Sequence, residues 1–265
     1  MACSCASRRQ AQHSFDAGTG SAYINADRGK SIVLLPPYVT SALAPIHRAG
    51  WPFIAGGLVL SLVLGVLWTP LLWLGLLATA WMAYFFRDPA RVTPQDDRIV
   101  VSPADGMVQA IAPRRPPSEL GLGDAPLTCI SVFLNVLDVH VNRSPVGGRI
   151  TRLVYHPGKF LNAADDKASE DNERQSFRIE TEGGMVVGLV QIAGLIARRI
   201  VRFVEQGEVV RAGQRVGLIR FGSRCDVYLP DGLAPQVLIG QRAIAGETVL
   251  ADGRRNRAAS GGRRS

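Results

Sequence analysis

A glycine–serine pair, Gly222-Ser223, stands directly in front of a strand-like run that ends at Pro230. A serine hydroxyl can attack the carbonyl of the preceding residue, and glycine suits the attacked position because it tolerates strained dihedrals. β-Elimination from the resulting ester would cut the chain and turn the serine into dehydroalanine, which hydrolyses to a pyruvoyl group. A pyruvoyl ketone forms a Schiff base with an amine and acts as an electron sink, as pyridoxal phosphate does. An ordinary turn is the competing interpretation of an isolated Gly-Ser pair.

Three polar side chains, Asp138, His140 and Asn142, alternate with valines in an otherwise apolar segment. Alternation places them on one face of a predicted strand. Polar side chains on such a face should either be exposed at a sheet edge or line a polar cavity. The segment is therefore a candidate for chemistry, with an exposed edge strand as the simpler alternative.

Two further polar groups supply candidate acids and bases. Asp105 lies in the turn-like stretch Ser-Pro-Ala-Asp-Gly, and His156 precedes a very polar, loop-like stretch at 165–174. A Ser-His-Asp triad can be written from Ser223 and these residues. However, Ser223 lacks the G-x-S-x-G elbow of serine hydrolases, so that class fits poorly.

The elements that must position these residues begin with an apolar segment. No charged residue occurs from residue 51 to residue 86, whereas a spanning helix needs about 20 apolar residues. Thr69-Pro70 divides the segment, and Arg48 and Arg87 flank it, so we predict a transmembrane helical hairpin with both ends in the cytoplasm. The alternatives are one long tilted helix, which would place the rest of the chain outside, and a buried pair of core helices.

The rest of the chain alternates short β-branched runs with glycine and proline, which is typical of strands joined by turns. We expect a mainly β fold: a β-rich sandwich or flattened barrel over 88–252, with hairpins like those of lipoyl carriers but without a carrier lysine. A short helix is expected within 194–204. The predicted organisation is completed by a disordered tail at 1–40, the anchoring hairpin at 41–87 and a basic disordered tail at 253–265.

The amino-acid composition limits the classes of binding partner that the protein can have. The net charge is +8 and the pI about 9.8, which suits nucleic acid or an anionic membrane surface. Aromatic residues make up only 7% and form no basic–aromatic pattern, so we expect no nucleic-acid partner. The cysteines, Cys3, Cys5, Cys129 and Cys225, suggest neither a disulfide framework nor a metal site. They favour a reducing compartment and hence a cytoplasmic catalytic domain.

Several stretches together resemble the phosphatidylserine decarboxylase proenzymes of the shorter, pyruvoyl-dependent type. They include SPADGMV, FLNVLDVHVNRSP, YHPGKFLNAADDKASEDNERQ, GQRVGLIRFGSRCDVYLP and GQRAIAGETVLA, and they run in the family's order from about residue 85 to 251. The resemblance implies self-cleavage between Gly222 and Ser223. The products would be a β chain, 1–222, and an α chain, 223–265, that begins with the pyruvoyl group and stays in an α/β heterodimer, with higher oligomers left open. The activity implied is conversion of phosphatidylserine to phosphatidylethanolamine and CO2 through a Schiff base, at the inner membrane.

The same resemblance assigns roles to single residues. Asp105 matches the family aspartate of the self-cleavage triad, and His140 matches the first histidine of the longer type's D-Y-H-x-x-H-x-P motif, which is linked to decarboxylation. The second histidine, the presumed cleavage base, falls on Arg143, and arginine stays protonated. The base is then His140 or His156, or geometry alone drives the acyl shift; we favour His140 because it shares a face with other polar side chains. Arg143 and Asn142 are the expected substrate-binding residues.

Two rival functions remain at this point. One is a decarboxylase of another seryl lipid, such as an ether lipid, whose head group would be the same. The other is a catalytically inactive, membrane-tethered β-domain that binds lipid or a partner. The intact Gly222-Ser223 pair disfavours the inactive domain.

Overall fold

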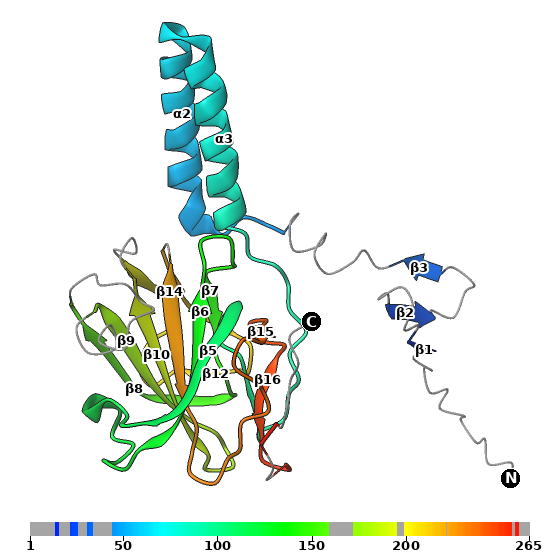
Figure 1. The fold of residues 1–265 in the computed structure, drawn as a ribbon, viewed down its shortest axis with the longest axis vertical. Coiled ribbons are helices and arrows are strands. Elements are labelled where there is room, and N and C mark those ends of the chain that lie inside the picture. Colours follow the sequence, from blue (N-terminus) through cyan, green and yellow to red (C-terminus); the bar gives the residue numbers. More distant parts are fainter. Residues whose placement is uncertain are drawn as a thin grey trace, which may run out of the picture.

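The computed structural model describes residues 14–15, 22–25, 31–33, 44–158, 172–194, 199–220, 222–255 and 258–259. Its main parts are a pair of long helices and a β-rich domain from which the helices project (Figure 1). The predicted fold class, mainly β with a preceding helical hairpin, is confirmed. Most of the loop at 165–174 and of the C-terminal tail lies outside the described residues.

The two helices are α2 (Trp51–Leu67) and α3 (Thr69–Phe85), with the 3-10 turn η1 (Arg48–Gly50) in front of α2. The chain reverses at Trp68, whose backbone is extended, and Pro70 then begins α3 in the first turn, where its missing N–H costs nothing. The alternative of one long helix is therefore wrong. The segment Arg48–Leu67 is long and apolar enough to cross a membrane, and α3 is a shorter apolar helix.

Small residues let the helices approach each other closely. Gly57, Ser61 and Gly65 are spaced four apart along α2, so they lie on one face. The facing pairs are Gly57 with Thr79, Ser61 with Gly75, and Gly65 with Leu72. A Cβ added at Gly57 would lie 2.8 Å from the Thr79 hydroxyl, and this close small-residue contact is the packing that membrane helices favour. The outward faces are apolar and exposed, for example Val66 at 88% and Leu77 at 69%.

The β-domain is built on one large antiparallel sheet, which curls on itself (Figure 1). Its order is β12 (Val209–Val210), β8 (Gly148–His156), β9 (Arg174–Glu180), β10 (Val186–Ala193), β14 (Ser223–Tyr228), β6 (Leu127–Leu134), β5 (Gly106–Arg114) and β15 (Arg242–Ala243). A three-stranded sheet has the order β11 (Ile200–Arg202), β13 (Arg215–Ile219) and β7 (Val141–Arg143). β16 (Val249–Asp252) pairs with β4 (Ile99–Val101), and a 3-10 turn, η2 (Ser118–Leu120), lies between β5 and β6.

Alternation along the strands of the large sheet sets one face against the core. Cys225 and Val227 of β14 belong to the main core cluster, as do Val132 and Leu134 of β6. Ser223 is two residues before Cys225, so its side chain points to the same interior face. The first residue of β14 thus presents a hydroxyl to the core.

Three local expectations differ from the structure. Residues 200–202, expected in a short helix, form β11, because they pair with β13. The predicted strand from Asp138 to Asn142 pairs only over Val141–Arg143, since residues 135–138 form a turn. In the N-terminal tail, expected to be disordered, three short strands pair in the order β1 (Ser14–Phe15), β2 (Ala22–Asn25) and β3 (Ser31–Val33).

Candidate active site

The Gly222-Ser223 junction lies where β14 enters the large sheet. Ser223 is in register with Ala193 of β10 and Leu134 of β6, and it is fully buried. Its Oγ has no hydrogen-bond partner among the described residues. Gly222 has a φ of 63°, in the left-handed region that favours glycine, with open space where a Cβ would stand. The junction therefore combines an unpaired buried hydroxyl with a backbone conformation that other residues adopt only under strain.

His140 contacts this junction directly. Its Nε2 lies 3.3 Å from the backbone nitrogen of Gly222, and its Nδ1 lies 2.9 Å from the carbonyl oxygen of Asp138. These contacts fit a neutral ring in which Nδ1–H donates to Asp138 and Nε2 accepts from Gly222. Burial lowers the pKa of His140 to about 4, so the ring is uncharged at neutral pH. A neutral Nε2 in contact with Gly222 can act as a base at this junction.

A short turn orients the imidazole. The Asp138 carboxylate accepts from the backbone N–H of Asn135 at 2.9 Å, and the Asn135 side chain accepts from the N–H of Leu137 at 2.8 Å. Asp138 is buried and also pairs with Arg242. With its carboxylate and backbone both held, Asp138 presents its carbonyl oxygen to His140 in a fixed position.

The end of helix α3 covers the imidazole on another side. The ring centroids of Phe85 and His140 lie 4.3 Å apart. Phe85 and Phe86 are fully buried and pack with Val139, Val141 and other apolar side chains at the base of the hairpin. This apolar cover is a physical source of the burial that lowers the pKa of His140.

Two buried amides connect the sheets beneath the junction. Gln191 Nε2 of β10 donates to Asn142 Oδ1 of β7 at 2.7 Å, and both residues are fully buried. Asn142 shares a face of its segment with His140, whereas Gln191 is two residues from Ala193, the partner of Ser223. Asn142 Nδ2 and Gln191 Oε1 have no partners among the described residues, so this amide pair keeps one unpaired donor and one unpaired acceptor.

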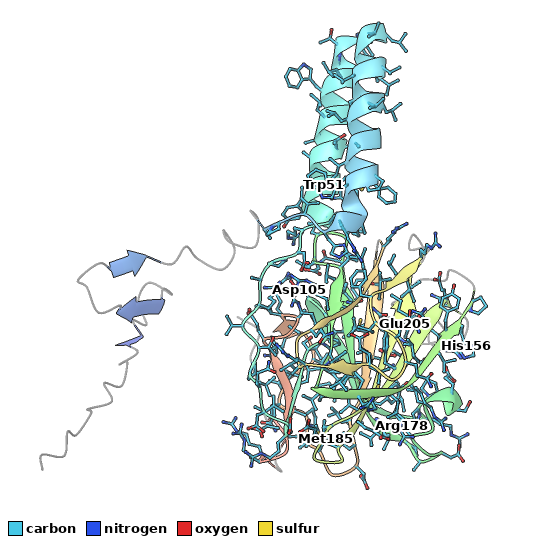
Figure 2. The ribbon with its side chains drawn as sticks, turned by 180° about the vertical axis from the view of Figure 1, so that it is seen from behind. Trp51, Asp105, His156, Arg178, Met185 and Glu205 are labelled. Atoms are coloured by element: carbon cyan, nitrogen blue, oxygen red, sulfur yellow. The ribbon has the colours of Figure 1, made fainter. Side chains whose placement is uncertain are left out.

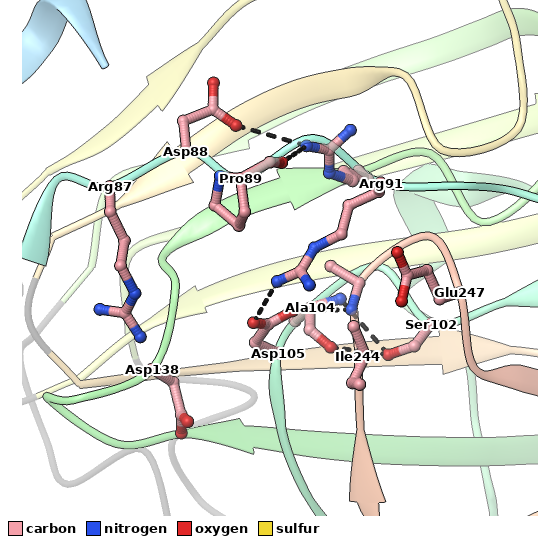
Figure 3. A network of polar contacts seen from close by, with 12 residues as sticks. Arg87, Asp88, Pro89, Arg91, Ser102, Ala104, Asp105, Asp138, Ile244 and Glu247 are labelled. Atoms are coloured by element: carbon pink, nitrogen blue, oxygen red, sulfur yellow. Dashed lines mark hydrogen bonds and ion pairs between the residues drawn. The ribbon is translucent and has the colours of Figure 1, made fainter. Parts of the chain in front are cut away.

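Asp105 is held in a neighbouring polar network (Figure 3). One carboxylate oxygen accepts from Arg91 at 2.6 Å and the other from the N–H of Ala245 at 2.8 Å. Burial raises the pKa of Asp105, although the positive charge of Arg91 opposes the shift. Figure 3 shows Asp105 and Asp138 in one region, with Arg87 beside them. In the described part of the chain, however, the Nδ1 partner of His140 is the Asp138 carbonyl and not the Asp105 carboxylate.

Arg143 points away from His140 and Asn142, because it is an odd number of residues from each along the extended chain. Its guanidinium donates to the carbonyls of Gly213 and Pro89 at 2.9 Å each and to Asp88 at 3.3 Å. The structure thus uses Arg143 to hold the linker that follows α3, and does not bring it to the Gly222-Ser223 junction.

His156 lies far from the junction. It is in register with Arg174 of β9, which pairs with Ile192 of β10, which pairs with Arg224 of β14. Three strand spacings of about 4.8 Å each therefore separate His156 from β14. His156 is 3.3 Å from Glu119, is 40% exposed, and lies at the outer side of the domain, away from Asp105 (Figure 2).

The structure thus brings His140 to the Gly222-Ser223 junction, links Asn142 to the neighbouring strand β10 through Gln191, and holds Asp105 in an adjacent network. Sequence reasoning missed Phe85, Gln191 and the role of the Asp138 carbonyl. For Gln191 a signal was present, since a glutamine inside the apolar run Gly188–Ala193 must be paired or serve a purpose. Among the described residues, no group of three or more His, Cys, Asp or Glu side chains is arranged to hold a metal ion.

Comparison with known proteins finds relatives that match the part of the chain containing these site residues. The family model described as phosphatidylserine decarboxylase matches residues 78–251. The chain is 60% identical over 210 residues to a phosphatidylserine decarboxylase proenzyme of Beijerinckia indica subsp. indica, which covers 79% of this chain and 90% of that protein. The matched region includes α3's C-terminal part, His140 and the Gly222-Ser223 junction.

Proposed function

This chain belongs to the phosphatidylserine decarboxylase family, and on that premise we propose that it cuts itself at Gly222-Ser223 and decarboxylates phosphatidylserine. The product would be phosphatidylethanolamine, and the cofactor would be a pyruvoyl group made from Ser223. The observation that carries the proposal is the unpaired, buried Ser223 hydroxyl beside a positive-φ glycine whose N–H contacts His140.

The first step is an acyl shift. Ser223 Oγ attacks the carbonyl carbon of Gly222, His140 Nε2 takes the hydroxyl proton, and the Gly222–Ser223 C–N bond breaks as the nitrogen is protonated. An ester then joins Gly222 to the serine oxygen. His140 suits this step because its low pKa keeps Nε2 unprotonated, and because the nitrogen already lies at the junction.

Elimination completes the cleavage. Removal of the α-proton of residue 223 breaks the Cβ–Oγ bond, and Gly222 leaves as a carboxylate. Water then releases ammonia from the dehydroalanine and leaves a ketone at the new N-terminus. That pyruvoyl ketone supplies an electron sink for decarboxylation of an amine-bearing substrate. The free Nδ2 donor of Asn142 is available to hold the carboxylate of the serine head group.

The two products of cleavage stay together because the cut precedes a central strand. β14 lies between β10 and β6, and the same fragment supplies β15 and β16. Its residues Cys225, Val227 and Leu229 are fully buried in the main core. We therefore expect an α/β heterodimer that separates only on denaturation.

The hairpin explains how the enzyme reaches a lipid. Both of its ends lie at the β-domain, and its apolar outer faces are exposed (Figure 1). Arg48 and Arg87 stand at these ends, which by the positive-inside rule supports a β-domain on the cytoplasmic side of the inner membrane.

Mass spectrometry of purified protein tests the proposal. We expect two chains, ending at Gly222 and starting at a blocked residue 223, and turnover of phosphatidylserine to phosphatidylethanolamine. Ser223→Ala should remain a single chain and be inactive. A wild-type chain that stays intact would instead support the inactive, membrane-tethered β-domain.

A further inference from the structure

The turn between β6 and β7, Asn135–Asp138, carries two apolar side chains at its tip. Val136 is 39% exposed and Leu137 is 55% exposed. Turn tips usually carry glycine, proline or short polar residues. Exposure of two adjacent aliphatic side chains to water is unfavourable, and moving them into an apolar environment lowers their free energy.

The tip cannot fold back to hide these side chains, because the turn is fixed. The Asp138 carboxylate and the Asn135 side chain each accept from a backbone N–H of the turn, and the N–H of Asp138 donates to the Asn135 carbonyl at 3.0 Å. The exposure of Val136 and Leu137 is thus a property of a rigid turn.

The turn is also fastened to the end of helix α3. Arg87 Nη2 donates to the Leu137 carbonyl at 2.7 Å, and Arg87 Nη1 donates to the Tyr84 carbonyl at 2.8 Å. The same guanidinium lies 3.7 Å from the centroid of the Tyr84 ring. Tyr84 and Arg87 are the residue types that mark a membrane–water interface. Figure 1 shows the loop between β6 and β7 at the base of the hairpin.

We propose that Val136 and Leu137 insert into the lipid surface beside the hairpin and so set the height of the active site at the membrane. The inference rests on the proposed membrane insertion of the hairpin and on the proposed substrate. A lipid bilayer is the occupant the structure favours, because the tip is bonded to Arg87 at the base of the hairpin, and both the tip and the two helices expose apolar side chains. The Asp138 carbonyl that orients His140 belongs to the same turn, so the lipid contact and the base move as one unit.

A fluorescent label tests the insertion without using activity. Leu137→Cys would carry an environment-sensitive dye in a chain with Cys3→Ser and Cys5→Ser; Cys129 and Cys225 are buried. The full chain would be reconstituted in vesicles of phosphatidylcholine and phosphatidylserine containing lipids with a quencher on the acyl chain. We expect strong quenching at position 137. The matched control is Val209→Cys. Val209 is 59% exposed and lies in β12, in register with Arg149 at the start of β8. Equal quenching at the two positions would overturn the proposal.

A second experiment asks whether the contact serves turnover. Val136→Ser combined with Leu137→Ser should lower kcat/KM on vesicle phosphatidylserine by roughly tenfold or more, because the tip then loses the apolar surface that would contact the lipid. Self-cleavage, and turnover of a short-chain, water-soluble phosphatidylserine, should stay unchanged. An equal loss on both substrates would overturn the lipid-docking role. Absence of turnover on both substrates in the unmodified chain would instead reject the proposed function, and the quenching result would still decide whether the tip inserts.

Discussion

Phe85, the last residue of helix α3, stacks against His140, with the ring centroids 4.3 Å apart. One ring belongs to the hairpin and the other to the segment that leads into β7, 55 positions along the chain. Because both residues are fully buried, the contact makes the hairpin part of the environment of the proposed base. The hairpin therefore contributes to the protonation state of His140.

The first prediction concerns Phe85→Ala. Loss of the ring should let water reach His140 and raise its pKa from about 4 toward the ordinary value of about 6.5. A protonated ring cannot take the Ser223 proton, so the cleavage rate falls as pH drops through the pKa of His140. In a plot of cleavage rate against pH, the fall at low pH should therefore occur about one pH unit or more higher than in the unmodified chain. Timed cell-free synthesis followed by gel analysis at several pH values would measure this shift.

Phe85→Leu, which keeps an apolar cover over His140, is the control and should shift the fall in rate less. An unshifted fall in rate in Phe85→Ala would mean that Phe85 does not control the titration.

The second prediction concerns Arg143. Arg143→Ala removes donors to Gly213, Pro89 and Asp88, and should lower the free energy of unfolding by about 1–3 kcal/mol. The KM for phosphatidylserine should stay unchanged, because the guanidinium points away from the junction. Denaturant titration in detergent and steady-state kinetics measure the two quantities. Arg211→Ala, at an exposed arginine near the same turn, should change neither. A raised KM with unchanged stability would restore Arg143 as a substrate-binding residue.

The third prediction separates fold from function at the amide bridge. Gln191→Leu leaves the buried Asn142 Oδ1 without its partner and should cost about 1–3 kcal/mol of stability. Replacing both Asn142 and Gln191 with leucine should recover much of that stability, because no unpaired amide remains. Decarboxylation should stay impaired in the double variant, since the free Nδ2 donor is gone. Thermal unfolding and product assays would measure the two effects, and full activity in the double variant would show that the bridge only supports the fold.

The fourth prediction uses two adjacent glycines of α2. A Cβ at Gly57 would crowd the Thr79 side chain, whereas nothing lies within 4 Å of a Cβ at Gly56. Gly57→Leu should therefore separate the helices and lower stability by about 1–3 kcal/mol. Gly56→Leu should be tolerated. Thermal unfolding and limited proteolysis in detergent would compare them; equal behaviour of the two variants would argue against the close helix contact.

Parts of this architecture follow from local sequence and parts do not. The uncharged segment and Thr69-Pro70 specify the hairpin, and alternation along residues 138–142 is enough to place His140 and Asn142 on one face. The same alternation excludes Arg143 from that face, an inference available from the sequence. The stacking of Phe85 on His140 depends on how α3 docks on the β-domain, which no local pattern encodes. The distance between His156 and the Gly222-Ser223 junction depends on strand order, because β9 and β10 lie between β8 and β14.

The last prediction decides between the two histidines. His140→Ala should abolish or severely slow the cut at Gly222, because Nε2 contacts the backbone nitrogen of Gly222 and no described group stands in its place. His156→Ala should cut at the normal rate, because His156 lies three strands from β14 and its partner is Glu119. Loss of that partly exposed pair should cost at most about 1 kcal/mol. Pulse-labelled chains sampled over time give both rates, and thermal unfolding checks that each variant folds. If His156→Ala stops the cut in a folded chain while His140→Ala does not, the assignment of the base is wrong. If both variants cut normally, the left-handed Gly222 backbone and the unpaired Ser223 hydroxyl are sufficient for the acyl shift.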